Sequence, residues 1–273
     1  MYTISNFCED IYLQPEIRND VHYFYNKTDF NEYLDYMSGI MSQKNPFENF
    51  VKLSKLIEND ERGIKILTVY LECARRCLSN YQKEGIDKKI YIDTMKCFPR
   101  FIQEYYQKNG CYGFSCPWWA YRQLNMTIFR LGALEFEFSV SQKELTIGIH
   151  IPSDTDFREE SINESFHLCR KFIEKHRSEF TEAQFTCHSW LLSPYLKFIL
   201  EENTNIIRFQ NLFDITNVYE NEMQYMDYIF HADARTPLQD LRENTSLQKG
   251  VKELLKKSIN LGAAYGIMKQ KEK

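Results

Sequence analysis

The chain has 273 residues with a formal net charge of -4, and 43% of its residues are hydrophobic and 15% aromatic. This composition supplies a sizeable core for one large or two modest domains, and it excludes a largely disordered chain. A mildly acidic chain with dispersed basic residues is also a poor general binder of nucleic acid. We interpret the basic tail after Lys249 as a solvated helix face rather than a phosphate-binding patch.

The lack of a recognisable targeting signal and the spacing of the cysteines favour an intracellular protein. The first residues show no secretory pattern, and no apolar window of about 18 residues is present to form a membrane span. The 8 cysteines form no CxxC pair. Cys73 and Cys77 share one helix face but lack the other two ligands of a zinc site. We therefore expect reduced, mostly buried thiols in a cytoplasmic protein with no metal site and no membrane partner.

Residues 1–125 are predicted to form a series of helices. Apolar residues recur at steps of three and four most clearly from Ile64 to Tyr81, and again from Tyr91 to Tyr105. Pro99 lies inside the second stripe and predicts a kink or a restart of that helix. Shorter stripes of the same kind occur at residues 17–24, 30–41 and 47–57, and a further short helix begins at Pro117.

The hydrophobic period changes to two after about residue 126, which is typical of half-buried strands. We predict an α+β protein, with an all-helical N-terminal domain over 1–125 and a mixed α/β domain over 126–273. Asp156 or Ser161 is the expected cap of the helix in the mixed domain. The predicted elements are strands 134–140 and 145–151 joined by a hairpin turn in "SVSQKE", a helix over 162–173, a strand over 184–192, a short helix over 194–200, strand-like runs at 205–215 and 221–232, and a helix from about Thr245.

The stretch "FTCHSWLLSPYLKF" over residues 185–198 places a cysteine, a histidine and a serine side by side. On a strand, Cys187 and His188 point to opposite faces, so they cannot form a nucleophile–base pair with each other. Cys187 is expected in the core, whereas His188 is either a packed histidine or a catalytic one. Tyr195, at the start of the next helix, could act as a general acid or simply pack.

His150 ends its strand in "LTIGIHIPSD", where ligands of α/β folds collect, and it could approach His188 if the two strands are neighbours. The next loop, "PSDTDFREES", precedes a helix whose N-terminus could hold a phosphate with hydroxyls from Ser153, Thr155 and Ser161. Its four acidic residues would repel an anion and favour simple capping. Glu135 and Glu137 are possible bases or solvent-facing residues of their strand. We find no GxSxG, P-loop, HExxH or dinucleotide motif.

Five stretches of the second half resemble one known family: "RLGALEFEF", "IGIHIPSD", "CHSWLLSP", "NIIRFQNLF" and "TSLQKGVKELL", in this order over residues 128–258. They resemble the GNAT-like C-terminal domain of bacterial acyltransferase-domain proteins, which also carry a helical N-terminal domain. The resemblance implies that the family's fourth and fifth strands, here 144–151 and 185–192, splay apart around the pantetheine arm of acyl-CoA. It also implies a pyrophosphate loop at 152–161 and a thiolate-protonating acid at Tyr195.

The loop departs from the family pattern, because it has no glycine where backbone amides normally approach the pyrophosphate. Two hypotheses follow. The first is an N-acyltransferase that moves an acyl group from acyl-CoA, such as acetyl-CoA, to a small-molecule amine or peptide acceptor by direct attack, with CoA held differently. Its candidate residues are His150 or His188 as base, Tyr195 as acid, and Ile149, Ile151, Ser153, Thr155 and Ser161 at the cofactor. The second is a non-catalytic GNAT-like binding or scaffold protein.

Overall fold

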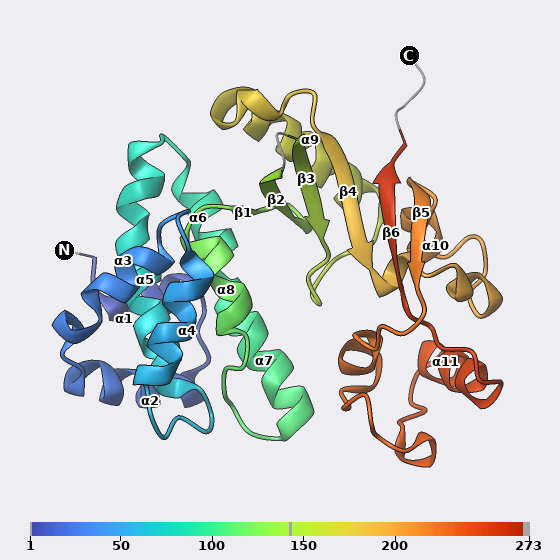
Figure 1. The fold of residues 1–273 in the computed structure, drawn as a ribbon, viewed down its shortest axis with the longest axis horizontal. Coiled ribbons are helices and arrows are strands. Elements are labelled where there is room, and N and C mark those ends of the chain that lie inside the picture. Colours follow the sequence, from blue (N-terminus) through green and yellow to red (C-terminus); the bar gives the residue numbers. More distant parts are fainter. Residues whose placement is uncertain (1, 142–143, 270–273) are drawn as a thin grey trace. The chain divides into compact units, whose positions relative to one another are not determined.

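The computed structural model describes residues 2–141 and 144–269. The chain divides into two compact units, Met1–Arg130 and Leu131–Lys273 (Figure 1). No helix in these residues is long and apolar enough to cross a lipid bilayer. The predicted hairpin turn in "SVSQKE" contains positions 142–143, which lie outside the described residues.

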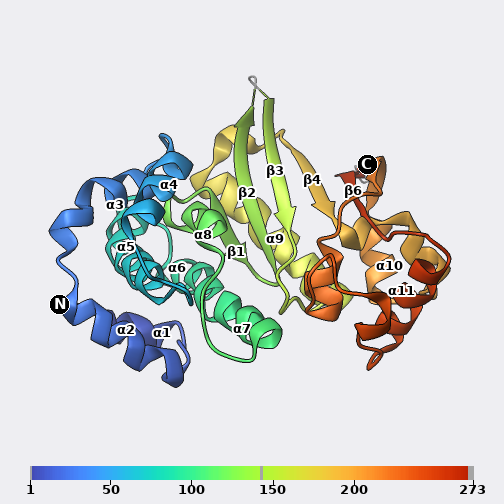
Figure 2. The same cartoon turned by 60° about the horizontal axis from the view of Figure 1, so that its bottom comes forward.

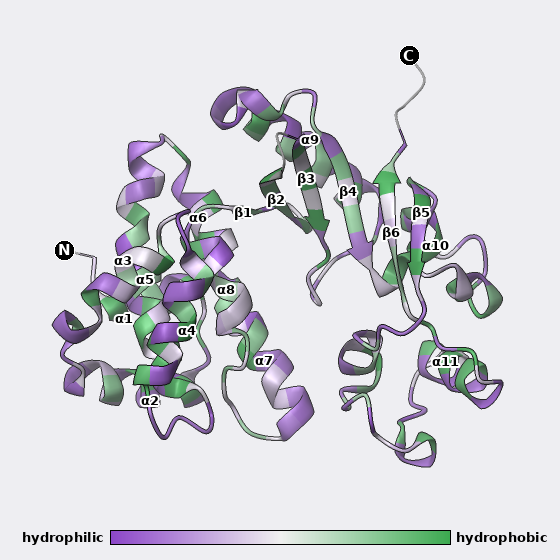
Figure 3. Ribbon diagram, in the orientation of Figure 1, coloured by the Kyte–Doolittle hydropathy of each residue, from purple (hydrophilic) through white to green (hydrophobic). Residues whose placement is uncertain are grey.

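The first unit is helical, as its apolar stripes predict. The central helix, α5, is amphipathic (Figure 3) and contacts α1, α2, α3, α6 and α8. Its buried face includes Leu67, Leu71 and Tyr81, three members of the predicted stripe. The helices are α1 (Ile4–Asp10), α2 (Pro15–Lys27), α3 (Leu34–Ile40), α4 (Pro46–Leu56), α5 (Ile64–Lys83), α6 (Lys88–Met95), α7 (Cys97–Asn109) and α8 (Pro117–Leu124), with a short 3-10 helix at Phe30–Tyr33.

The predicted break at Pro99 is wrong in position. Helix α6 ends at Met95, Lys96 forms the junction, and α7 starts at Cys97, so Pro99 lies within the first turn of α7. A proline is tolerated there because the first backbone N–H groups of a helix have no intrahelical partner. The break itself is real, but it precedes the proline instead of coinciding with it.

A buried carboxylate joins two helices of this unit. The Glu72 side chain on α5 is only 1% exposed and accepts hydrogen bonds from Tyr25 Oη on α2, Arg75 Nε and Nη2, and Arg76 Nε, at 2.6–3.1 Å. Burial by itself raises the pKa of Glu72, but the hydrogen bonds and charges of the two arginines outweigh it and hold the pKa below its ordinary value. Both carboxylate oxygens are therefore fully engaged.

The second unit is built on strands β2 to β6 of a mixed sheet with the strand order β1-β2-β3-β4-β6-β5, and the residues of β1 up to Arg130 belong to the first unit. Strands β3 and β4 are parallel, and the pairs β2–β3, β4–β6 and β6–β5 are antiparallel. Helix α9 (Glu159–His176) connects the two parallel strands, as a parallel pair requires. The strands are β1 (Ile128–Leu131), β2 (Leu134–Ser141), β3 (Glu144–His150), β4 (Gln184–Ser189), β5 (Phe213–Tyr219) and β6 (Ala263–Met268).

One face of the sheet is apolar and is covered by α9 (Figure 2). Phe136 and Phe138 of β2 pack their rings against Phe166 and Phe172 of α9, with ring centroids 5.9 and 5.6 Å apart. Ile147, Ile149 and Cys187 alternate onto the same face and are buried. The predicted location of Cys187 in the core is therefore confirmed.

Four predictions for the second half are wrong. The strand expected over 184–192 ends at Ser189, and Trp190–Leu192 forms a 3-10 helix. The run 205–215 starts as helix α10 (Asn205–Gln210), and only its end joins β5. The run 221–232 is not a strand, because Met226–Phe230 forms a single π-helical turn. The cap of α9 is Arg158, with no side-chain capping bond, instead of Asp156 or Ser161. In addition, strands β1 and β6 were not expected from the sequence.

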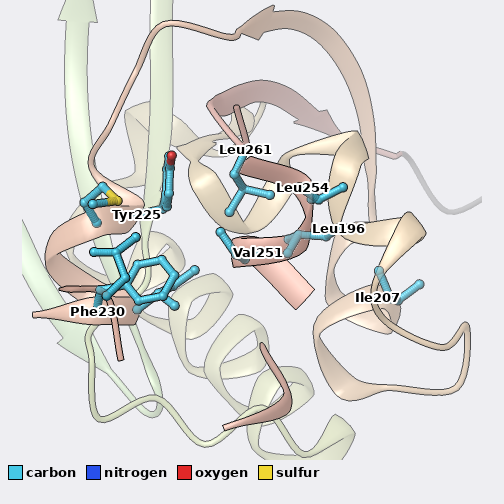
Figure 4. Packing of buried hydrophobic residues seen from close by; sticks show 10 residues of the cluster. Leu196, Ile207, Tyr225, Phe230, Val251, Leu254 and Leu261 are labelled. Carbon is cyan, nitrogen blue, oxygen red and sulfur yellow. The ribbon is translucent and has the colours of Figure 1, made fainter. Parts of the chain in front are cut away.

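Other elements of this half follow the prediction closely. Helix α11 (Ser246–Lys256) begins after Thr245, whose side chain forms a capping box with Gln248. The helix expected over 194–200 is a 3-10 helix at Pro194–Phe198. A cluster of buried apolar residues includes Leu196 of this helix (Figure 4). Its buried members are Leu196, Ile207, Tyr225, Met226, Ile229, Phe230, Leu241, Val251, Leu254 and Leu261.

Candidate active site

Both histidines singled out in the sequence lie on the sheet face opposite α9. Gly148 of β3 is in register with Thr186 of β4, and paired residues of neighbouring strands share a face. His150 and His188, each two residues further along, therefore extend from the same polar face. The strands that carry them are neighbours, as the approach of the two histidines requires.

The parallel ladder between β3 and β4 is short. It pairs Thr146 with Gln184, Ile147 with Phe185, and Gly148 with Thr186. Beyond this point both strands continue, but β4 pairs with β6, where His188 is opposite Tyr265. The two histidines thus follow the last parallel pair, at the carboxyl ends of adjacent parallel strands. Crevices outside such strand ends are where α/β folds bind ligands.

His150 is paired with a carboxylate of the neighbouring strand β2. Its Nε2 lies 2.7 Å from Glu137 Oε2 in a hydrogen bond, and the two side chains are 26% and 20% exposed. Glu137 is in register with Gly148, so the pair is a diagonal contact across two antiparallel strands. Glu137 is thus hydrogen-bonded to the histidine, and Glu135 is buried, so the expectation that these residues face solvent is wrong.

His188 is paired with a carboxylate that comes from much later in the chain. Its Nε2 lies 3.2 Å from Glu222 Oε1, and its side chain is 41% exposed. The imidazole also packs against the Tyr219 ring, with centroids 4.9 Å apart. The other oxygen of Glu222, Oε2, is buried and has no hydrogen-bond partner. Glu222 therefore has an ion-pair contact at Oε1 and an unsatisfied atom at Oε2.

Tyr195 reaches the same turn, residues 219–222. Its hydroxyl donates a hydrogen bond to Glu220 Oε1. This hydrogen bond, together with partial loss of solvent and the negative charge, raises the pKa of Tyr195 above its ordinary value. A phenol held in this way is a weaker acid than a free one. The turn therefore contacts both a candidate base, His188, and a candidate acid, Tyr195.

The residues expected at the cofactor have varied surroundings. The Ile149 side chain is buried beneath α9, so only its backbone can face a ligand. Ile151 is half-buried and Ser153 is exposed. Thr155 Oγ1 donates to the carbonyl of Ala133 at 3.1 Å. The Thr155 hydroxyl, one of the candidate phosphate ligands, is thus already hydrogen-bonded to the protein backbone.

Asp156 engages a second hydroxyl of that loop. Its carboxylate accepts hydrogen bonds from Ser161 Oγ at 2.6 Å and from the backbone and side chain of Arg158. These hydrogen bonds, that of the Arg158 side chain above all, lower the pKa of Asp156 below its ordinary range. A negative side chain thus occupies the start of α9, where the family pattern places a pyrophosphate.

Neither the Cys187 thiol nor a metal cluster offers another chemistry in the part of the chain that the structure describes. Burial raises the pKa of Cys187 to about 12, so its thiol stays protonated and is a poor nucleophile. Among the described residues, no group of three or more histidine, cysteine or acidic side chains is placed to hold a metal ion. Sequence reasoning missed Glu220 and Glu222. Their alternate spacing in "VYENEMQY" was the available signal, but their partners are distant in the chain.

Comparison with known families agrees with this architecture. Residues 3–126 match the family model of the N-acyltransferase N-terminal domain, and residues 128–268 match that of the GNAT-like C-terminal domain. The chain belongs to the N-acyltransferase family that joins these two domains. The predicted family and fold class are thereby confirmed. No match was found among curated protein sequences.

Solved structures show the same fold. An acyltransferase in complex with decanoyl-CoA and teicoplanin is 23% identical, with a TM-score of 0.70, and the match covers 76% of this chain and 66% of that one. An acyltransferase in complex with CoA and 10C-teicoplanin gives the same values. An acyltransferase mutant in complex with octanoyl-CoA is 22% identical, with the same TM-score and coverage. This N-acyltransferase family member thus spans slightly less than two thirds of each of these chains.

Proposed function

We propose that this protein is a cytoplasmic N-acyltransferase that moves an acyl group from acyl-CoA to the amine of a small-molecule or peptide acceptor. The observation that carries the proposal is the parallel β3–β4 pair, which ends after Gly148 and Thr186 in a GNAT-like domain and is followed by carboxylate-paired histidines. The complexes of similar acyltransferases with CoA, octanoyl-CoA and decanoyl-CoA support the donor class. We assign the donor site to residues 126–273.

The proposed reaction is direct attack by the acceptor amine on the thioester carbonyl. The new C–N bond forms as the C–S bond breaks, the amine loses one proton to a base, and the thiolate gains one. We assign the base to His188, because it is the more exposed of the two histidines. His150 is the alternative base, since Glu137 orients it in the same manner.

Tyr195 is the proposed acid for the leaving thiolate. In the resting protein the Tyr195 hydroxyl donates its hydrogen bond to Glu220, so this bond must break before Tyr195 can donate its proton to sulfur. The donor's pantetheine arm would run along the backbone of Ile149 and Ile151. Hydroxyls of Ser153, Thr155 and Ser161 would approach its diphosphate, provided that the Asp156 carboxylate moves away from the start of α9.

A non-catalytic GNAT-like binding protein is the second candidate function. One observation favours it: Asp156 already supplies a negative group at the start of α9, in contact with Arg158 and Ser161. Because like charges repel, a diphosphate at this position would first have to displace the carboxylate. A protein that never binds CoA could retain such a loop without cost.

Thermal unfolding with CoA, acetyl-CoA, octanoyl-CoA and decanoyl-CoA separates the two functions. A ligand at about 100 times its dissociation constant adds about 2.7 kcal/mol to the unfolding free energy, and we expect such a shift with at least one acyl-CoA. Release of free thiol in the presence of primary amines, with product identified by mass spectrometry, then tests transfer. Absence of any shift at millimolar CoA contradicts the donor assignment, and a shift without thiol release supports the binding protein.

A further inference from the structure

The Glu222 carboxylate is placed asymmetrically. Oε1 faces the imidazole of His188 at 3.2 Å, whereas Oε2 is buried without a hydrogen-bond partner. Leaving a buried polar atom unpaired costs about 1–3 kcal/mol, so such groups are rare in folded proteins and call for an explanation. A carboxylate that served only stability would have both oxygens paired, as Glu72 has.

The turn that carries Glu222 is held firmly. Asn260 Nδ2 donates to the carbonyl of Glu220, and Tyr225 Oη donates to Asn260 Oδ1 at 2.6 Å. Gly262, just before β6, has a φ of +63°, and a Cβ there would lie 2.5 Å from the carbonyl oxygen of Tyr219. The backbone at Gly262 therefore approaches the turn so closely that a residue with a side chain would clash there. These contacts fix the position from which Glu222 faces His188.

A fixed carboxylate selects one tautomer of a neutral imidazole. An ionised carboxylate can only accept hydrogen bonds, so the proton of the ring is favoured on the nitrogen that faces it. That nitrogen is Nε2, and the lone pair is then on Nδ1. Within the described residues, Nδ1 of His188 has no protein partner, and the 41% exposure of the side chain leaves the ring accessible.

We infer that Glu222 is a positioning residue that keeps the proton of neutral His188 on Nε2 and so presents Nδ1 as the proton-accepting atom. Tyr219 supports this arrangement by packing against the ring. The catalytic consequence rests on the proposed function: Nδ1 takes the proton that the acceptor amine loses as the C–N bond forms. The tautomer itself does not depend on the reaction.

Nitrogen NMR of ¹⁵N-histidine-labelled protein tests the inference without any substrate. Spectra are recorded at about pH 8.5, above the ordinary histidine pKa of about 6.5, and the His188 signals are identified by their loss in His188→Gln. We expect a protonated Nε2 and an unprotonated Nδ1 in the native protein. In Glu222→Gln the amide can face Nε2 with either end, so the population of the Nε2–H form should fall toward that of a free neutral imidazole. Glu220→Gln, on the same turn, is the matched control and should leave the signals unchanged.

Two spectra would overturn the inference: a native His188 with its proton on Nδ1, or an unchanged Nε2–H form in Glu222→Gln. Kinetics add the catalytic part. Glu222→Gln should lower kcat by about 10–100-fold, as loss of an orienting partner typically does, with little change in KM for the acyl donor. If no acyl-CoA is turned over, the proposed function fails, while the spectra still decide the role of Glu222.

Discussion

Each of the two units contains a carboxylate beside basic side chains, but the two carboxylates differ in how fully their oxygens are paired. Glu72 of the helical unit is fully buried, and both its oxygens accept hydrogen bonds from Tyr25, Arg75 and Arg76. Glu222 of the sheet unit has one contact, to a partly exposed His188, and one buried oxygen with no partner. We propose that the difference separates a carboxylate that serves stability from one that orients a catalytic histidine. A hydrogen-bond network in which every atom is paired rigidifies a core. A buried oxygen without a partner destabilises the fold and calls for a functional explanation.

The largest expected effect is on turnover. His188→Gln should lower kcat by about 10²–10⁴-fold, the range that a general base contributes, and should leave the unfolding free energy within about 0.5 kcal/mol because the side chain is partly exposed. Thiol release under saturating acyl-CoA measures the first, and urea unfolding the second. His150→Gln is the matched control. Activity lost in that variant and retained in His188→Gln would move the base to β3.

A matched pair of substitutions, at Glu72 and at Glu222, compares how much each carboxylate contributes to the free energy of unfolding. Glu72→Gln removes a buried charge and leaves Arg75 and Arg76 without their counter-ion, so the unfolding free energy should fall by about 3 kcal/mol. Glu222→Gln removes a contact that is already incomplete and should change it by less than about 0.5 kcal/mol. Urea unfolding of both variants at neutral pH provides the measurement. Equal losses at the two positions would show that both carboxylates serve stability.

The same comparison has a pH dependence. The pKa of Glu72 is lower in the folded protein than its ordinary value of 4.5, so its contribution to stability is complete above that value and is lost as pH falls through the folded pKa. The stability gap between the native protein and Glu72→Gln should therefore narrow below about pH 4.5. Urea titrations from neutral to acidic pH can follow it. A gap that widens on acidification would contradict the assigned role of the arginines.

The smallest effect is expected at the second carboxylate of the turn. Glu220→Gln removes the charge that accepts the Tyr195 hydroxyl, so the pKa of Tyr195 should fall toward its ordinary value of 10.0. The phenolate absorbance of Glu220→Gln, compared with that of Glu220→Gln/Tyr195→Phe, isolates this group. Turnover should change only a few-fold, because Tyr195 is freed without being removed. An unaltered titration would mean that Glu220 does not hold the phenol.

Local patterns predicted much of the fold. The stripe from Ile64 to Tyr81, the alternation in β2 and β3, and the polar helix start near Thr245 are all patterns of a few residues. Each element formed where expected. Prediction failed where a short apolar run fits two structures. Residues 205–210 became a helix because Thr204 caps it with its side chain. Strand β6 was missed because its sequence AAYGIM has consecutive apolar residues and no two-residue alternation.

The candidate site was predicted only in part. His150, His188 and Tyr195 are visible in the sequence because their residue types and strand positions are unusual. Glu220 and Glu222 were not identified, since each contacts a residue far away in the chain. A contact of this kind depends on how β5 and β6 pair, with an irregular register between Ile215 and Asn217. No local periodicity carries that information.

By itself, the sequence determined the two-part organisation and the separation of Cys187 from His188, because these depend on the hydrophobic period of short segments. The family followed from the resemblance of five of its stretches. Only the tertiary structure decided that β3 and β4 part after three residue pairs, that Asp156 occupies the start of α9, and that Glu222 faces Nε2 of His188. The reason is physical. Strand pairing and burial are set by segments that meet through folding, so the state of each ionisable group depends on neighbours that the local sequence does not contain.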